Sequence, residues 1–372
     1  MKNKKAKREP VQVIREYRYS KKVRIWTSIG ASVMALLGAL CITVSAFGMH
    51  MLGLINFVTP DDDIYDPNAD ISHEEDDLNY SEPFDPSLYD DAQSLSDIPV
   101  RGNTKGIRNI MLLGIDSNSF SGRSDTMIIL SINDNTKTIR MVSLLRDTWV
   151  SIPGRDKNGD GVDDINKLNS AYAFGKFRLL SKTLEQNFRL DIDEYLGVNF
   201  KVLPILIDAL GGLDVTLTAK EMTQVPDYGC TYTASSHDPR FVSLKGKPGV
   251  YHLTGFQAME YARIRAIDSD FKRTERQRKV IGLLIEKAKN MSYSQLIDAV
   301  YGALPHIDTN MSADEFLAFA ANAVKYSSYT IDNSFHVPEE NGYKGVTING
   351  GSGLQLLDPR QTVTNLHKYL YE

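Results

Sequence analysis

The chain has 372 residues, of which 42% are hydrophobic and 24% charged, and its net charge is −5 at pH 7. This composition is ordinary for a folded protein, and the length allows one large domain or two smaller ones with additional segments. The two cysteines, Cys41 and Cys230, form no C-x-x-C motif, which excludes a zinc or redox site of that kind.

Charge is strongly segregated along the N-terminal part of the chain. Residues 1–24 are basic, residues 25–59 contain no Lys, Arg, Asp or Glu, and residues 61–97 are acidic without any Lys or Arg. The uncharged run exceeds the ~20 apolar residues that cross a hydrocarbon core of about 30 Å, and it is too short for two crossings. It therefore predicts one transmembrane anchor over residues 25–59.

A secretory signal peptide is the alternative interpretation of this run, because V-S-A at residues 44–46 resembles a cleavage site. The apolar part of a signal peptide has only about 7–15 residues, so the longer run favours a retained signal anchor. The basic residues precede the run, which predicts a cytoplasmic tail over residues 1–24 and an extracellular remainder. We thus expect a single-pass protein of the cell membrane, with Cys41 and Cys230 too far apart for a disulfide.

Residues 60–105 are rich in acids and prolines, as in D-D-D-I-Y-D-P-N-A-D and H-E-E-D-D. Such segments bury too little apolar surface to offset the entropy of ordering, which predicts a disordered linker. Like charges extend a chain, so we expect this linker to hold the folded domain away from the membrane.

The folded domain is predicted to cover residues 106–372, and its elements alternate between two periodicities. Short apolar or β-rich runs predict strands at 108–115, 126–133, 138–145, 194–200 and 213–218, with the second and third joined in a hairpin by the turn D-N-T-K. Helix-like spacing predicts helices at 167–188, 254–263, 273–291, 294–303, 313–326 and 359–371, while 202–210 is an apolar helix or another buried segment. Strands interleaved with helices indicate an α/β fold or an α-β-α sandwich.

The stretch D-S-N-S-F-S-G-R-S-D-T at residues 116–126 places Asp116, Asp125 and Arg123 in one polar loop between two apolar runs. The residues alone allow a salt bridge, a metal site or an anion site. Loops that leave the ends of strands are where α/β folds collect their ligands, which favours a binding site.

Basic residues of the extracellular part cluster in short motifs. Arg146 and Asp147 directly follow a predicted strand, Lys167 begins a predicted helix, and Arg263 and Arg265 lie two residues apart, on one face if the segment is extended. Guanidinium groups match phosphate oxygens in bidentate geometry, so this pattern indicates an anion site.

Purely structural interpretations of these basic residues remain open. The pair Arg146–Asp147 is also consistent with a structural ion pair. Taken alone, Arg276, Arg278 and Lys279 are typical of a solvated helix face.

Seven motifs follow one another between residues 106 and 291: G-I-D…G-R-S-D-T, S-L-L-R-D-T, K-L-N-S-A-Y, V-N-F, D-A-L-G-G-L, Y-A-R-I-R and D-F-K-R-T-E-R-Q. In this order, and behind an N-terminal anchor, the chain resembles the LytR-CpsA-Psr family. Members of that family transfer teichoic acids or capsular polysaccharide from a polyprenyl-pyrophosphate carrier to peptidoglycan in Gram-positive bacteria. The resemblance implies an α-β-α sandwich with a long apolar pocket for the lipid tail, and a phosphotransferase of cell-wall biogenesis with no nucleic-acid partner.

The resemblance also implies roles for individual residues. Asp116 and Asp125 match the acids that hold a divalent metal at the pyrophosphate. The residues that match the rest of the pyrophosphate site are Arg123, Arg146, Lys167, Asn199, Arg263, Arg265, Asp270, Arg273 and Gln277. Ser170 stands where members often have His, so a catalytic role for that position is not expected.

The chemistry agrees with these implied roles. Mg²⁺, or Mn²⁺ in its place, is bound by carboxylates and phosphate oxygens, which suits two Asp and no His or Cys cluster. Arginines stabilise the charge that develops on a phosphate leaving group. A sugar hydroxyl of peptidoglycan would attack, with Asp116, Asp125 or Asp270 as its base and Arg146 among the catalytic residues.

A second acidic stretch, D-K-N-G-D-G-V-D-D at residues 156–164, resembles the first half of an EF-hand calcium loop. Asp156, Asn158, Asp160 and Asp164 occupy ligand-like positions, but Lys167 stands at the twelfth position, where a Glu is required. The stretch is consistent with either a calcium site or an Asp/Gly turn.

Three functions are consistent with the sequence. The first is the phosphotransferase, and the second is a pyrophosphatase or phosphatase that acts on the same lipid with water as acceptor. The third is a non-catalytic lipid-binding regulator, an attenuator of envelope genes. A cytoplasmic tail of 24 residues is too short for a DNA-binding domain, and its basic residues suit anionic lipid head groups better.

Overall fold

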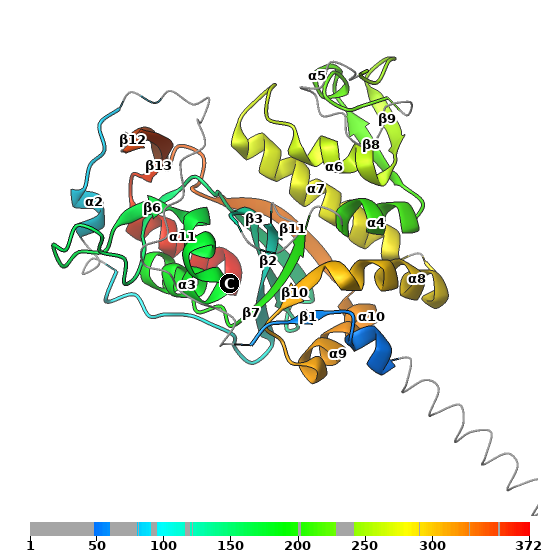
Figure 1. Cartoon of the computed structure of the whole chain (residues 1–372), viewed down its shortest axis with the longest axis horizontal. Helices are drawn as coiled ribbons and strands as arrows, with labels where there is room; N and C mark the ends of the chain where they lie inside the picture. The colour runs from blue at the N-terminus through cyan, green and yellow to red at the C-terminus, as the bar shows by residue number, and fades with distance from the viewer. Residues whose placement is uncertain are drawn as a thin grey trace, which may run out of the picture. The chain divides into compact units, whose positions relative to one another are not determined.

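A computed structural model describes residues 48–59, 80, 82–90, 95–115, 120, 122–199, 202–227, 242–289, 291–326, 328–348 and 350–372. The chain divides into two units, Met1–Gly53 and Leu54–Glu372, and the second contains the sheet (Figure 1). No helix within the described ranges has the length and apolar character needed to cross a membrane. Residues 25–47 of the predicted anchor lie outside the described residues.

Seven strands form the central sheet of the second unit. In their order across the sheet they are β1 (Asn56–Phe57), β10 (Ile307–Thr309), β7 (Glu194–Asn199), β2 (Ile107–Ile115), β3 (Ser124–Asn133), β4 (Thr138–Leu144) and β11 (Thr330–Val337). The predicted hairpin is confirmed, since β3 and β4 pair antiparallel from Met127–Leu144 to Asn133–Thr138.

Three further pairs of strands lie outside the central sheet. They are β5 (Trp149–Ser151) with β6 (Ile165–Lys167), β8 (Leu213–Leu217) with β9 (Gly249–Leu253), and β12 (Tyr343–Ile348) with β13 (Gly351–Leu356). The helices are α2 (Ser87–Asp90), α3 (Leu168–Phe188), α4 (Val202–Ala209), α5 (Ala219–Met222), α6 (Gly255–Arg263), α7 (Asp270–Lys289), α8 (Tyr293–Ala303), the 3-10 turn η2 (Leu304–His306), α9 (Ala313–Ala321), α10 (Ala323–Tyr326) and α11 (Pro359–Tyr371).

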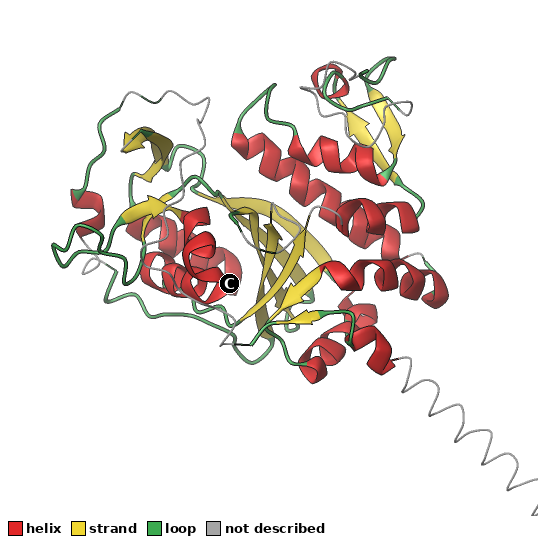
Figure 2. Ribbon diagram, viewed as in Figure 1, coloured by secondary structure: helices red, strands yellow, loops and turns green. Residues whose placement is uncertain are grey.

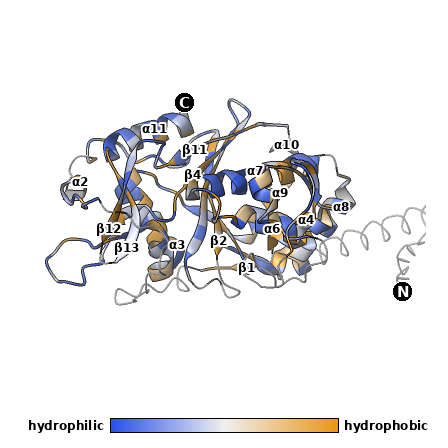
Figure 3. Ribbon diagram, turned by 90° about the horizontal axis from the view of Figure 1, so that it is seen from above, coloured by the Kyte–Doolittle hydropathy of each residue, from blue (hydrophilic) through white to orange (hydrophobic). Residues whose placement is uncertain are grey.

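Helices pack on both faces of the sheet, as Figure 2 shows. On β2, Met111 and Leu113 point into a core shared with α3 and α11, whereas Ile110 points into a second core shared with α7 and α9. This alternation follows from the two-residue period of a strand. The hydropathy colouring in Figure 3 shows apolar ribbon along the strands between these helices. The α/β prediction is confirmed.

Several loops meet at one end of the sheet's strands, which we call the sheet edge. β2, β4, β7 and β11 run in one direction and end at this edge, whereas the antiparallel β3 and β10 begin there. Ile115 at the end of β2 pairs with Ser124 of β3 and with Asn199 of β7. The polar residues that follow or begin these strands are therefore neighbours.

Parts of the predicted linker are packed on the domain, so the prediction of disorder is wrong for them. Glu82 bridges to Val346 of the β12–β13 hairpin, and the buried Gln355 amide accepts from Asp85 N at 3.0 Å and donates to Asp85 O at 2.5 Å. Leu95 is 6% exposed. Composition could not predict this packing, because the side chains that bond to this backbone, Lys344, Thr347 and Gln355, lie more than 200 residues away in the sequence.

Helix α3 confirms the predicted helix but contains a break. Gly175 and Lys176 have non-helical dihedrals, and Lys176 is left-handed with φ 52°. Lys176 Nζ donates to Phe120 O at 2.6 Å, and Tyr172 OH donates to the same carbonyl at 3.3 Å. The break thus turns a lysine toward the loop between β2 and β3.

Candidate functional site

Three arginines converge on Asp125, the second residue of β3. Arg146 Nη1 lies 2.6 Å from Asp125 Oδ1, and Arg265 Nη2 lies 3.6 Å from Asp125 Oδ2. Arg273 Nη2 donates to the backbone carbonyl of Asp125 at 3.5 Å. Three cations around one carboxylate leave an excess of positive charge, which attracts a further anion.

Asp147 pairs with Arg146 and with a fourth cation, Lys167. Its Oδ2 lies 3.3 Å from Arg146 Nε, and its Oδ1 lies 3.2 Å from Lys167 Nζ. The side chains of Arg146, Asp147 and Lys167 are all at least nine-tenths buried. Burial fixes their geometry, since charged groups removed from water must stay paired.

Backbone hydrogen bonds fix the loop that carries Arg146 and Asp147. The loop directly follows β4, and Leu145 N donates to Val337 O of the neighbouring β11 at 2.8 Å. Leu354 N of the β12–β13 hairpin donates to Asp147 O at 2.8 Å. The hairpin approaches so closely that a Cβ on Gly353 would lie 2.6 Å from Asp147 O, so glycine is required there.

Helix ends supply the remaining cations. Lys167 is the last residue of β6 and the N-cap of α3, where its side chain makes no capping hydrogen bond and turns to Asp147 instead. Arg273 lies in the first turn of α7 and is only 2% exposed. Arg265 lies in the loop between α6 and α7, and 47% of its side chain is exposed.

The site keeps its carboxylates ionised. Burial would raise the pKa of the Asp125 carboxyl, but Arg146 and Arg273 outweigh burial and hold the pKa below its usual range. For Asp147, burial acts in the same sense, and Arg146 and Lys167 again lower the pKa overall. Both groups are therefore anions throughout the physiological range of pH.

These lowered pKa values predict a loss of stability in acid. A carboxylate whose folded pKa is below its unfolded value stabilises the fold above about pH 3.9, and this contribution disappears as the pH falls through the folded pKa. We expect the free energy of unfolding, measured by urea titration between pH 6 and pH 2.5, to fall less steeply in Asp147→Asn than in the wild type. The exposed Asp298→Asn should follow the wild-type curve. Equal slopes for all three proteins would contradict the assignment.

The structure places the other predicted residues around this centre without joining all of them to it. Arg263, at the end of α6, lies 3.4 Å from Glu260, and Asn199, at the end of β7, lies 3.4 Å from His306 Nδ1. Arg123 immediately precedes β3 and is half-buried. Gln277 lies one turn after Arg273, and its buried Oε1 has no hydrogen-bond partner among the described residues.

Two predicted acids are not placed as side chains. Asp116 lies outside the described residues, although it follows Ile115 at the end of β2. Asp270 begins α7, and only its backbone is described.

The interpretation of Arg276 and Arg278 as a solvated helix face is wrong. They are 4% and 3% exposed. Arg276 lies 2.7 Å from Asp268 and 3.6 Å from Glu221, and Arg278 donates to Ser143 Oγ at 2.6 Å. Their burial is possible because these partners come from three other segments, which helix periodicity cannot reveal.

The calcium-like stretch lies between β5 and β6, and its side chains bond to the loop itself. Asp156 accepts hydrogen bonds from the backbone of Gly159, Asp160 and Gly161 at 2.7, 3.1 and 2.8 Å. Asn158 donates to Asp160 at 2.9 Å, and Asp164 lies 3.5 Å from Arg155. Lys167, at the twelfth position, points to Asp147. Calcium binding stays a prediction.

Within the described ranges, no three His, Cys, Asp or Glu side chains gather where they could hold a metal ion. The Asp125 carboxylate lies among the arginines, and in the sequence Asp116 directly follows β2, whose last residue Ile115 pairs with Ser124. Two carboxylates without His or Cys suit a hard cation that takes its remaining ligands from phosphate and water. The donor chemistry therefore fits Mg²⁺ or Mn²⁺.

Comparison with protein families assigns the chain. Residues 68–365 match the LytR_cpsA_psr family. The chain belongs to this family. The match includes the sheet edge, the arginines around Asp125 and the C-terminal hairpin.

Related proteins of the LytR_cpsA_psr family agree with this fold. A protein of Enterococcus faecalis named polyisoprenyl-teichoic acid–peptidoglycan teichoic acid transferase TagU is 32% identical over 59% of this chain. The chain spans just under two thirds, 66%, of that relative's length. A crystal structure from Streptococcus agalactiae has a TM-score of 0.58 at 26% identity, over 71% of this chain and 88% of that one. A structure of TagT bound to LIIa-WTA has a TM-score of 0.55 at 25% identity, over 73% and 94%.

Sequence reasoning missed two polar residues that contact predicted site residues. Asp147 was recognised only as a neighbour of Arg146, whereas it links Arg146 to Lys167. His306 reaches Asn199 from η2, at the start of β10. The first had a signal in its position after a strand, and the second had none, because β10 was not predicted.

Proposed function

We propose that this chain is a membrane-anchored phosphotransferase, which moves a glycopolymer phosphate from a polyprenyl-pyrophosphate carrier to peptidoglycan. The observation that carries this proposal is the convergence of Arg146, Arg265 and Arg273 on Asp125 at the strand ends. The name of the Enterococcus faecalis relative and the ligand of the TagT structure agree with it. Residues 25–47 would contribute the anchor, with residues 1–24 in the cytoplasm and the domain outside.

The pyrophosphate would lie against the exposed sides of the arginines. Arg263 and Arg265 each keep 47% of their side chains exposed, so they are accessible to a ligand that approaches from solvent. Bidentate hydrogen bonds from guanidinium groups would orient the two phosphates. Arg123, Lys167, Asn199 and Gln277 would complete the polar lining, with the Gln277 Oε1 free to accept a hydrogen bond from the ligand.

Asp125 and Asp116 would hold Mg²⁺ at the pyrophosphate. When bound, the cation neutralises phosphate charge and makes the leaving group better. The arginines alone would neutralise part of that charge, because they are preorganised and need no rearrangement during the reaction.

The polyprenyl chain would lie along half-buried apolar side chains beside this site. Leu203 of α4 and Leu283 and Leu284 of α7 are only partly buried at the border of one apolar core. Leu112 of β2 and Leu196 of β7 are partly buried at the border of the core beneath α7 and α9. Covering such surfaces with a hydrocarbon chain is favourable by about 25 cal/mol per Å².

Transfer would proceed by attack of a peptidoglycan sugar hydroxyl on the phosphorus nearer the glycan. The bond from this phosphorus to the bridging oxygen breaks, and polyprenyl phosphate leaves with the bonding electrons. The hydroxyl proton passes to a carboxylate. Asp125 is a poor acceptor, because the arginines lower its pKa, which leaves Asp116 and Asp270 as the candidate bases.

The test is the formation of the transfer product. The full-length protein is incubated with a polyprenyl-pyrophosphate glycan, peptidoglycan oligomers and Mg²⁺, and the glycan-phosphate–peptidoglycan adduct is measured by mass spectrometry. We expect Arg265→Ala to reduce its rate by about 10²-fold, as for other groups that stabilise transition-state charge. Lys272→Ala is the matched control, since Lys272 is exposed and pairs with Glu275.

The other outcomes separate the alternative functions. Free glycan phosphate in the presence of a competent acceptor would establish a hydrolase. Lipid that is bound by the wild type and never consumed would establish a lipid-binding regulator and contradict the transferase.

A further inference from the structure

The strand β1 ties the chain just after the predicted anchor to the edge of the central sheet. Asn56 and Phe57 pair in parallel with Asp308 and Thr309 of β10. The Asn56 side chain donates to Asp308, which also accepts from Tyr195 OH at 2.7 Å. Ile55 is only 7% exposed. The folded domain therefore begins at residue 54, which corrects the predicted domain start at Gly106 and the predicted anchor end at residue 59.

This connection leaves little chain between the anchor and the domain. A span of ~20 residues that begins at Ile25 ends near residue 44, so at most about ten residues precede Ile55. Ten extended residues reach about 35 Å, and fewer if part of them is helical. The acidic segment comes after β1, so it cannot act as the spacer between membrane and domain that the sequence predicted.

Helix α9 lies directly beside β1 and presents an apolar outer surface. The rings of Phe57 and Phe316 are 6.3 Å apart in an edge-to-face contact. Beyond Glu315 the helix carries no charge, and its Leu317 is 46% exposed together with Ala318, Ala320 and Ala321. These four side chains make the exposed surface of α9 beyond Glu315 apolar.

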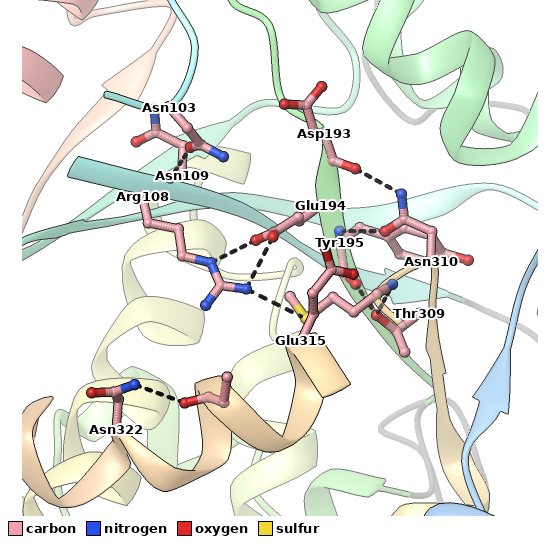
Figure 4. Close-up of polar contacts among 12 residues, drawn as sticks. Asn103, Arg108, Asn109, Asp193, Glu194, Tyr195, Thr309, Asn310, Glu315 and Asn322 are labelled. Atoms are coloured by element: carbon pink, nitrogen blue, oxygen red, sulfur yellow. Dashed lines mark hydrogen bonds and ion pairs between the residues drawn. The ribbon is translucent and has the colours of Figure 1, made fainter. Parts of the chain in front are cut away.

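Polar contacts hold this part of the molecule in place (Figure 4). Arg108 of β2 makes two hydrogen bonds to Glu194 of β7, at 2.7 and 3.0 Å, and its guanidinium lies 5.3 Å from the centre of the Phe319 ring of α9. Asn310, between β10 and α9, accepts from Tyr195 N at 3.0 Å. The exposed residues of α9 are thus displayed on a fixed support.

The strands of the sheet follow the same order as the parts of a polyprenyl pyrophosphate embedded in a bilayer. The lipid chain is nearest the membrane, and the pyrophosphate is farther out. β1, which follows the anchor, lies at the edge, β10, β7 and β2 come next, and Asp125 on β3 and Arg146 after β4 lie beyond them. The half-buried apolar side chains of α4, β7 and β2 lie between the anchored edge and the arginines. A lipid chain from the membrane would meet apolar surface first and cations second.

We propose that the edge formed by β1, β10 and α9 docks on the outer surface of the lipid bilayer, with Leu317 in contact with the lipid. This inference rests on the anchor of the proposed function. A bilayer is the occupant that the connection favours, because the chain between anchor and β1 keeps this edge within about 35 Å of the membrane. Docking there brings the apolar side chains of α4 next to the donor lipid.

The test uses the full-length protein in phosphatidylcholine vesicles, with Cys41→Ser and Cys230→Ser as background. A polarity-sensitive dye is attached at Leu317→Cys or at Leu357→Cys, which is equally exposed at 47% and lies between β13 and α11. We expect spin-labelled phosphatidylcholine to quench the dye at position 317 at least twofold more than the dye at position 357. Equal quenching at both positions, or none at 317, would overturn the docking.

A second variant tests the docking without any change at position 317, so it does not depend on whether Leu317→Cys folds correctly. Twenty Gly/Ser residues inserted between Gly53 and Leu54 lengthen the connection about threefold, which lowers the local concentration of the domain at the membrane by about fivefold. We expect a similar fall in turnover of vesicle-bound donor and no change with detergent-dispersed donor. An unchanged rate in vesicles would count against docking while leaving the transferase intact. If the wild type turns over neither the vesicle-bound nor the detergent-dispersed donor, and the dye at position 317 is still quenched, the transferase is rejected and the docking is kept.

Discussion

Replacing Arg146 with methionine is expected to lower the rate of glycan-phosphate transfer by about 10³-fold or more, the scale seen when an arginine is removed from a phosphoryl-transfer site. Arg146 touches both Asp125 and Asp147, at 2.6 and 3.3 Å. Its loss removes a cation from the site and leaves both carboxylates with fewer partners. The rate of adduct formation by the purified protein is the measurement.

Stability should change together with activity in Arg146→Met. Breaking one side of a buried ion pair typically costs about 3 kcal/mol, because the remaining charge stays out of water. The double variant Arg146→Met with Asp125→Asn removes one of the two charges that Arg146 neutralises, while Asp147 keeps Lys167 as its partner, so we expect it to recover part of the free energy of unfolding and none of the transfer activity. Recovery of activity in the double variant would show that Arg146 acts only through the fold.

Asp125→Asn is expected to separate binding from turnover. The substitution keeps the size of the side chain and removes a negative charge that competes with the ligand for Arg146, Arg265 and Arg273. We expect the donor to bind at least as tightly as in the wild type, as measured by calorimetry with the pyrophosphate lipid in detergent. Transfer should fall by about 10²-fold or more if the carboxylate also holds the metal.

The control for this variant is Glu260→Gln. Glu260 also contacts an arginine, Arg263, but this arginine is not one of the three that converge on Asp125. It should leave the Mg²⁺ dependence of the rate unchanged, whereas Asp125→Asn should need a higher Mg²⁺ concentration for half of its residual rate. A normal rate and a normal Mg²⁺ dependence in Asp125→Asn would reduce this residue to a structural role.

The sequence predicted those elements whose signal is local. The hairpin of β3 and β4 follows from two β-rich runs around a tight turn, and α7 follows from helical spacing over twenty residues. The motifs placed Asp125 and Arg146 at strand ends, and the sheet brings them to within 2.6 Å. Short strands such as β1 and β10 have no such signal, since two or three residues show no periodicity.

Long-range pairing explains the remaining errors. The segment around Asp85 appears disordered by composition, yet the Gln355 side chain, 270 residues later, makes hydrogen bonds to its backbone. Arg276 appears solvated by residue type, yet Asp268 and Glu221 pair with it in the interior. Composition and periodicity describe only the segment that contains a residue. They do not show which residue, distant in the sequence, will form a hydrogen bond or an ion pair with it.

The C-terminal hairpin has a consequence for where this protein can be divided. The seven sequence motifs end before Met291, although the family match extends to residue 365, and a fragment cut after the last motif would stop at that residue. Such a fragment would lack two of the seven sheet strands, β10 and β11, and would leave β1 without the strand it pairs with. It would also lack the hydrogen bond from Leu354 N to Asp147 O. The segment that carries the sequence motifs and the smallest folding unit are therefore different lengths of chain, and a gene fusion cut after the last motif would separate the arginine site from its support.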